Sequence, residues 1–256
     1  MRSTHERIWG WAFAPALLLG SAADAATLRV GSDVRRVEAG ARIDAGDGNA
    51  LIDEALAAVA AGDRGTSWRV TEMAEVGIRD YAEATGTVRQ ASGWLVDGDG
   101  SRGPAGLYAR GAAEARATIF DPAATASSGA RSAPTRLGLR IQELEVGERL
   151  VFELAGEVSG DGPGASSFVR LLGPGGELFR FSAGSFRETF ELAADHGGPL
   201  VLTLEADATA EVTGTTVNVE ATNSAAFAAT LRLVPEPAGL LLVAAGGLAV
   251  FGRRRR

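Results

Sequence analysis

The chain of 256 residues contains no cysteine and no lysine, and only two histidines. Without cysteine there is no disulfide, no thiol nucleophile and no cysteine-based metal site. Without lysine, the phosphate-binding loop that ends in Gly-Lys-Ser/Thr cannot form. A zinc site normally needs several histidine or cysteine ligands, which this chain lacks. These absences exclude the commonest nucleotide-binding and zinc-dependent classes of enzyme.

Few residues remain that could act as nucleophile and base. His5 lies in an N-terminal segment that we expect to be removed, which leaves His196. His196 follows Asp195 in a Gly-Gly-Pro turn, where adjacent residues do not orient one another as a catalytic triad requires, and there is no Gly-x-Ser-x-Gly motif. Carboxylates are numerous, but nothing marks two of them as a glycosidase pair. We therefore expect no enzymatic activity, with a secreted hydrolase as the least favoured alternative.

The charge balance argues against nucleic acid as a partner. The chain has 25 basic residues, all arginine, and 32 acidic residues. Removal of residues 1–25 and of the four C-terminal arginines leaves 19 arginines and 30 acidic residues, a net charge of −11. Nucleic-acid binding needs clustered positive charge. An acidic body suits a soluble extracellular protein whose copies repel one another.

Residues 1–25 have the layout of a secretory signal peptide. Two arginines form a basic start, residues 8–20 are apolar, and Ala23 and Ala25 form a small-residue cleavage site. We expect the mature chain to begin at Ala26. An uncleaved N-terminal anchor is the alternative.

Residues 235–256 contain three parts in a fixed order. Pro235, Glu236 and Pro237 form an extended tripeptide that presents one carboxylate between two rigid residues. Residues 238–251 carry no charge and would form a helix of about 21 Å, shorter than the ~30 Å hydrocarbon core of a bilayer. The chain then ends in four arginines, which the positive-inside rule retains in the cytoplasm: Arg253, Arg254, Arg255 and Arg256.

This arrangement resembles the PEP-CTERM sorting signal of Gram-negative bacteria. The resemblance implies that the chain is inserted into the inner membrane through residues 238–251 and cleaved near the tripeptide by an exosortase, an integral-membrane enzyme. It also implies that the partners are the exosortase and the secretion machinery, and that the product reaches the cell surface or the surrounding exopolysaccharide. A plain C-terminal tail anchor that is never cut is the alternative.

The body, residues 26–234, is expected to be mainly β. In its second half, apolar and polar residues alternate in the stretches 137–141, 150–154, 200–211, 217–221 and 227–233. Alternation with one polar face indicates antiparallel strands that are half exposed to water. Glycine-rich turns divide this half into about eight short strands, which is typical of a β-sandwich, with a jelly-roll-like arrangement as one option.

The first half of the body has a weaker pattern. Residues 67–79, 86–96 and 106–120 are rich in alanine and predict strands. Asn49 is placed to cap one short helix over residues 50–61. The apolar stripe of that helix would consist of Leu51, Ile52, Ala55, Leu56 and Val59.

Residues 121–135 are small, polar and interrupted by Pro122 and Pro134. They predict either a linker between two lobes or a long loop within one sandwich. We favour one domain, because the first half has few large apolar residues from which to build a core.

Two kinds of ligand site are candidates. Asp97 and Asp99, and the loop 44–49, place oxygen ligands on glycine-rich turns, as calcium prefers, but neither has the EF-hand spacing and Asp-Gly is also the commonest hairpin turn. Four aromatic residues could form a sugar-stacking platform, although burial in the core is the more usual role: Trp68, Trp94, Tyr81 and Tyr108. No cofactor is expected, with calcium as the one option.

The sequence therefore predicts a non-enzymatic exported protein of the cell surface or of the exopolysaccharide (biofilm) matrix. The alternative is a carbohydrate- or calcium-binding extracellular module, and exopolysaccharide is the candidate partner.

Overall fold

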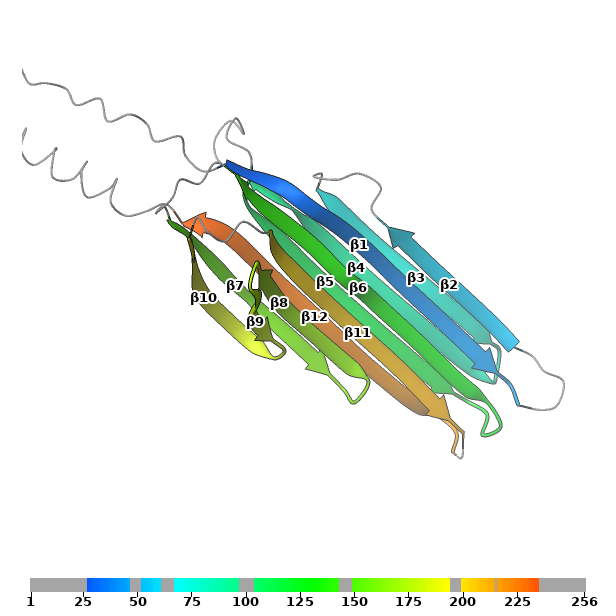
Figure 1. The fold of residues 1–256 in the computed structure, drawn as a ribbon. Helices are drawn as coiled ribbons and strands as arrows, with labels where there is room; N and C mark the ends of the chain where they lie inside the picture. The colour runs from blue at the N-terminus through cyan, green and yellow to red at the C-terminus, as the bar shows by residue number, and fades with distance from the viewer. Residues whose placement is uncertain are drawn as a thin grey trace, which may run out of the picture.

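The computed structural model describes residues 27–46, 52–60, 67–96, 104–142, 149–193, 199–214 and 216–234. Within these residues twelve strands form two six-stranded antiparallel sheets that pack face to face (Figure 1). The β-sandwich predicted from the alternation is confirmed. The strands are longer than expected: the 18 residues of β1 (Thr27–Asp44) span about 60 Å at ~3.3 Å per residue.

One sheet, called sheet A here, has the order β2-β1-β6-β11-β8-β9, and sheet B has the order β10-β7-β12-β5-β4-β3. The strands of the first half are β1 (Thr27–Asp44), β2 (Ile52–Ala60), β3 (Trp68–Ile78), β4 (Ala82–Val96) and β5 (Pro104–Ile119). Those of the second half are β6 (Thr125–Gln142), β7 (Arg149–Asp161), β8 (Ala165–Gly173), β9 (Gly176–Phe181), β10 (Gly184–Ala193), β11 (Leu200–Thr213) and β12 (Val219–Val234). Strands β3, β4 and β5 match the three strands predicted in the first half.

Both halves of the chain contribute strands to both sheets, so they share one core. β6 pairs with β1 in sheet A, and β12 pairs with β5 in sheet B. The prediction of a linker or long loop over residues 121–135 was wrong, because all but its first residues belong to β6. In this part of β6 the residues that face the core are small: Ala126, Ser128 and Ala130 are buried. Pro134 falls where the pairing register shifts, which is where a strand tolerates proline.

The predicted helix over residues 50–61 was also wrong, because residues 52–60 form the edge strand β2. β2 pairs with β1 from Arg36↔Ala60 to Asp44↔Ile52. Ala55 and Val59 pack against the core, whereas Leu56, a member of the expected helical stripe, is 76% exposed. Hydrogen bonding to β1 overrides a helical pattern that rests largely on alanine.

The interior changes along the length of the sandwich. β1 begins and β12 ends at the same end of the molecule (Figure 1), and large side chains fill that end. They include Leu107, Leu137, Leu139, Phe152, Leu154, Leu202 and Leu231. Alanine dominates the middle of the remote half, which includes Ala39, Ala41, Ala84, Ala113, Ala115, Ala130 and Ala208.

The two sheets approach closely where alanine dominates. A Cβ added to Gly86 of β4 would lie 2.3 Å from the carbonyl oxygen of Gly129 and 2.8 Å from that of Gly40, both in sheet A. Only small residues fit between backbones at this separation. At this point in the remote half, the two sheets are therefore separated by little more than backbone.

The sheets are also narrower in the remote half. β8 pairs with β11 only as far as Ala208, and β7 pairs with β12 only from Ser224. Beyond these points, the final residues of β11 and the first residues of β12 have a strand neighbour on one side only, among the described residues. This step in the sandwich forms one wall of the trough described below.

No helix within the described ranges is both long enough and apolar enough to cross a membrane. The predicted signal peptide (1–25) and the predicted C-terminal helix (238–251) lie outside the described residues.

Candidate functional site

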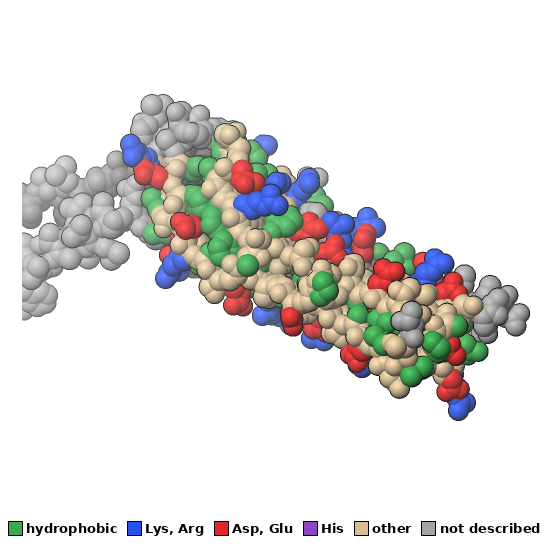
Figure 2. Space-filling view, turned by 90° about the horizontal axis from the view of Figure 1, so that it is seen from below, with side chains coloured by type: hydrophobic (Ala, Val, Ile, Leu, Met, Phe, Trp, Pro, Cys, Tyr) green, Lys and Arg blue, Asp and Glu red, His purple; other side chains and the backbone are tan. Residues whose placement is uncertain are grey.

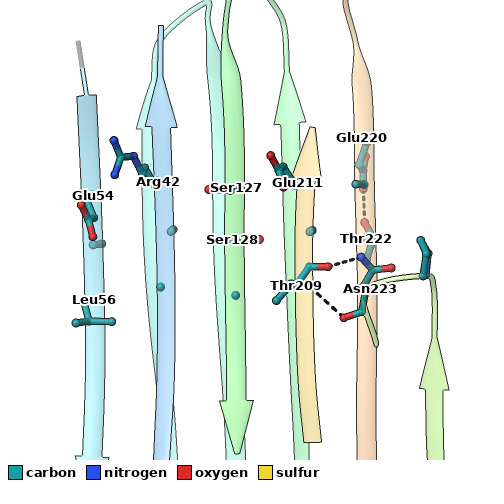
Figure 3. Close-up of a pocket in the computed structure, with 18 residues that line it drawn as sticks. Arg42, Glu54, Leu56, Ser127, Ser128, Thr209, Glu211, Glu220, Thr222 and Asn223 are labelled. Atoms are coloured by element: carbon teal, nitrogen blue, oxygen red, sulfur yellow. Dashed lines mark hydrogen bonds between the residues drawn. The ribbon is translucent and has the colours of Figure 1, made fainter. Parts of the chain in front are cut away.

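A trough with a volume of about 830 Å³ crosses the outer face of sheet A in its remote half and ends at β12 (Figure 3). Its lining comes from β1, β2, β6, β11 and β12 and from the turn before β8. The residues that carry polar or bulky side chains into it are Arg42, Glu54, Leu56, Ser127, Thr209, Glu211, Glu220, Thr222 and Asn223.

Glycine forms the floor of the trough. Pairing across sheet A places Leu56, Gly40, Gly129 and Thr209 in one row. A Cβ on Gly40 would meet nothing closer than Leu56 Cδ1 at 3.8 Å, and one on Gly129 nothing closer than Thr209 Cγ2 at 3.8 Å. Packing within the chain therefore does not require glycine on this face, and the missing side chains leave the floor open between Leu56 and Thr209.

The next row contains the charged groups. Glu54, Arg42, Ser127 and Glu211 lie side by side across four strands (Figure 3). Glu54 and Glu211 are three strand spacings apart, about 14 Å between backbones. Arg42 and Ser127 lie on the two strands between them, so the pairing does not place the two glutamates next to each other.

Hydrogen bonds hold the far wall in place. Asn223 of β12 is 5% exposed, and its Nδ2 donates to the carbonyl oxygen of Thr209. The backbone N–H of Thr209 donates to the carbonyl oxygen of Gly164 at 2.9 Å. Gly162, at φ +93°, leaves room for Asn223, since a Cβ there would lie 1.8 Å from Asn223 Oδ1. The wall joins the edges of the two sheets.

Ion pairs connect neighbouring strands on the outer faces of both sheets. On sheet A, Arg131 pairs with Glu205 and, at 3.7 Å, with Asp207. Burial raises the pKa of Asp207 above its usual 3.8, although Arg131 opposes this shift. On sheet B, Glu153 accepts from Arg187 at 3.1 Å and lies 3.0 Å from Arg232, and the hydrogen bond from Arg187 is the main reason that its pKa falls below 4.5. Neither carboxylate lines the trough.

The calcium candidates are only partly within the described residues. Asp97 and Asp99 lie outside them. Asp44, in the second loop, uses its Oδ1 to accept the backbone N–H of Gly46 at 3.0 Å, as in an Asx turn. No group of three or more acidic or histidine side chains in the described ranges is arranged to hold a metal ion. His196, Ala23 and Ala25, the Pro235–Pro237 tripeptide and Arg253 to Arg256 also lie outside the described residues.

The four aromatic residues do not form one platform. Trp68, Trp94 and Tyr81 are partly buried and pack against the core, as the usual role of aromatics predicts. Tyr81 lies in the turn before β4, and Trp94 lies near the other end of that strand. Tyr108 covers Gly93, where a Cβ would be 3.0 Å from its Cε1. None of the four lines the trough.

Sequence reasoning did not identify the trough. Leu56 and Glu54 were assigned to a helix, and Ser127 and Gly129 to a linker. Gly40 belongs to β1, for which no strand was predicted. The sequence signal that could have indicated the open floor is a glycine next to alanine in both segments, at residues 39–41 and 129–130.

The chain matches no protein-family model and no curated protein sequence. Among solved structures it is similar to infectious bursal virus derived T=1 particles, with 10% identity, a TM-score of 0.18 and coverage of 80% of this chain and 69% of that chain. It is also similar to the VP2 subviral particle of infectious bursal disease virus, with 8% identity, a TM-score of 0.18 and coverage of 80% and 71%. Likeness at this level carries no argument about fold or function.

Proposed function

We propose that this chain is an exported, non-enzymatic protein of the cell surface or exopolysaccharide matrix, processed at its C-terminus by an exosortase. The observation that carries the proposal is the ordered signal in residues 235–256: a Pro-Glu-Pro tripeptide, a short apolar segment and four arginines. The N-terminal segment supports it, because residues 1–25 have the layout of a signal peptide for export.

The fold is compatible with display from a membrane. β1 begins and β12 ends at the same end of an elongated body (Figure 1), and Val234, the last residue of β12, directly precedes Pro235. A chain held at residues 238–251 would therefore present the body end-on, with the trough near the remote end. The partners in this scheme are the exosortase, the secretion machinery and, transiently, the inner membrane.

The surface suits an extracellular setting. Figure 2 shows acidic and basic side chains interspersed along the visible face, with apolar side chains in small groups between them. Mixed charge with a net acidic excess keeps copies soluble and apart. It also supports the expectation that nucleic acid is not a partner.

Two variants of the C-terminal signal test the proposal in the native host. Glu236→Ala removes the carboxylate of the tripeptide, and we expect uncleaved protein to accumulate in the inner membrane. Neutral residues in place of Arg253 to Arg256 remove the charges that hold the terminus in the cytoplasm, at roughly 2.5–3.5 kcal/mol each at a bilayer centre. We expect that change to release unprocessed protein into the periplasm.

Fractionation with a tag inserted after Ala26 provides the measurement. Glu188→Ala serves as the matched control, because Glu188 is exposed on β10 and forms no ion pair within the described residues. The control should be processed like the wild type. If Glu236→Ala is cleaved and released at the normal rate, the tripeptide is only a connection and the proposal fails.

A further inference from the structure

Three arginines meet on the outer face of sheet B, far apart in the sequence but adjacent in the fold. Pairing places Arg69 of β3, Ala91 of β4 and Arg110 of β5 in one row. Arg89 lies two residues before Ala91 on the same strand and points to the same side. The backbones of Arg69 and Arg110 are two strand spacings apart, about 9.6 Å, and Arg89 is diagonal to both.

Arg69, Arg89 and Arg110 have no partner within the part of the chain that the structure describes, unlike the other arginines in sheet B. The strands of sheet B contain seven arginines, of which Arg116, Arg149, Arg187 and Arg232 each pair with a glutamate. Arg69, Arg89 and Arg110 form no ion pair or hydrogen bond with any described residue. Glu114, two residues beyond Ala112 on the same face, forms none with them. Like charges on neighbouring strands are unfavourable, so three arginines without a partner among the described residues would gain from an anionic ligand.

The three side chains surround a shallow depression. It has a volume of about 350 Å³, and its lining contains no acidic residue. Its floor is made of small residues, Ala91, Gly111 and Ala112. Ala91 is only 7% exposed although it lies on the outer face, which fits coverage by the aliphatic stems of the flanking arginines. The guanidinium groups are therefore arranged around an open, uncharged floor.

We propose that this arginine depression, Arg69, Arg89 and Arg110, binds the carboxylates of an acidic polysaccharide. The planar guanidinium group pairs with a carboxylate through two parallel hydrogen bonds. The backbones of the outer two arginines are about 10 Å apart, so the three guanidinium groups can engage more than one carboxylate, as a polymer with several carboxylates along its length supplies. A flat site on a sheet face admits a polymer from either side. An acidic polysaccharide would be the ligand through which the protein acts in the matrix, so this proposal rests on the proposed function.

A nucleic acid fits the same surface less well. Proteins that bind single strands stack the bases on aromatic side chains, and the lining of the depression contains none. A uronic-acid polymer needs no aromatic platform, because its carboxylates pair directly with guanidinium groups.

The test measures binding of the purified full chain, in a mild detergent, to polygalacturonate by affinity gel electrophoresis, with neutral dextran as the reference polymer. We expect the wild type to be retarded by polygalacturonate and not by dextran, with weaker retardation at higher salt. The triple variant Arg69→Gln, Arg89→Gln, Arg110→Gln should lose at least tenfold in affinity. Arg89→Gln alone should lose a few-fold in affinity. This single variant tests the proposal if the triple variant does not fold.

The matched control removes three arginines from the other face. Arg29, Arg136 and Arg140 lie in sheet A and likewise form no ion pair with described residues, so their change to glutamine alters the net charge equally. The control should keep its affinity within twofold. An equal loss in the control, equal binding of single-stranded DNA, or no binding by the wild type would each overturn the proposal. A negative result for polysaccharide binding would not contradict the proposed sorting, because the fractionation experiment in the host does not depend on any ligand.

Discussion

Gln90 of β4 and Thr135 of β6 lie on facing sheets and form a hydrogen bond inside the sandwich: Gln90 Nε2 donates to Thr135 Oγ1 at 2.7 Å. Ser132 Oγ donates to Gln90 Oε1 at 2.9 Å. None of the three residues is more than 2% exposed. A buried cluster of hydrogen-bonded side chains fixes the position of one sheet relative to the other. Apolar contacts alone would allow the two sheets to shift more easily.

Gln90→Leu should lower the free energy of unfolding by about 1–3 kcal/mol, because it leaves the buried Ser132 hydroxyl without its acceptor. Urea denaturation of residues 26–234 measures the change. The combined variant Gln90→Leu, Ser132→Ala, Thr135→Val removes all three polar groups and should recover most of the loss. Wild-type stability in Gln90→Leu alone would show that the cluster contributes nothing.

Gly86→Ala should be destabilising by about 1–3 kcal/mol, because the added Cβ would lie 2.3 Å from the carbonyl oxygen of Gly129 on the facing sheet. Gly77→Ala in the neighbouring strand is the control. A Cβ there meets only Glu83 Cγ at 3.9 Å, so the variant should match or slightly exceed the wild type in thermal unfolding. Equal melting temperatures for both variants would contradict the close approach of the sheets.

Glu153→Gln should destabilise the protein near pH 7 and lose this effect in acid. Arg187 holds the pKa of Glu153 below its usual 4.5, so the ionised carboxylate stabilises the folded state. That contribution is complete above about pH 4.5 and is lost as pH falls through the lowered folded-state pKa. Denaturation midpoints measured for both proteins between pH 7 and pH 3 should converge, and a constant difference would contradict the assignment.

Asp207→Asn should have the opposite effect on stability from Glu153→Gln. Burial raises the pKa of Asp207 above 3.8, so its ionised form opposes folding at pH 7 even with Arg131 beside it. The variant should be at least as stable as the wild type at pH 7. Its advantage should shrink as pH falls through the raised folded-state pKa towards 3.8, because the wild type then binds its proton. A marked loss of stability at pH 7 would mean that the Arg131 pair outweighs the burial.

Mass spectrometry of protein from the native host should find a chain that starts near Ala26 and ends near Pro235–Pro237. The N-terminal cut follows from the Ala23–Ala25 site and the C-terminal cut from the tripeptide. Recovery of protein that ends at Arg256 would reject processing and favour a tail anchor.

Chelator should leave the far-UV circular dichroism and melting temperature of residues 26–234 unchanged. The chain has no cysteine, and Asp44 in one calcium candidate already accepts the N–H of Gly46. A ligand that binds only the folded state stabilises it, so a lower melting temperature with chelator would establish a calcium site, with Asp97 and Asp99 as the residues to change next.

Strong local patterns predicted the fold class. In β11, Leu200, Leu202 and Leu204 are fully buried, whereas Val201 and Glu205 on the other face are half exposed. The strand was identified correctly because one face is apolar and meets the core. The patterns failed where alanine and serine carry the alternation, as in Ala126, Ser128 and Ala130 of β6. Small residues contribute little apolar area, so their periodicity is weak.

The sequence by itself determined the terminal signals that we propose for export and sorting, the absence of cysteine and lysine chemistry, and a β-rich body, since each depends on residues that are close together in the chain. Only the tertiary structure decided that residues 52–60 form an edge strand, that the sheets are separated by little more than backbone at Gly86 and Gly129, and that Arg69, Arg89 and Arg110 are neighbours. These features depend on pairing between strands that are distant in sequence. No local pattern encodes such pairing, because it is set by the packing of the whole sandwich.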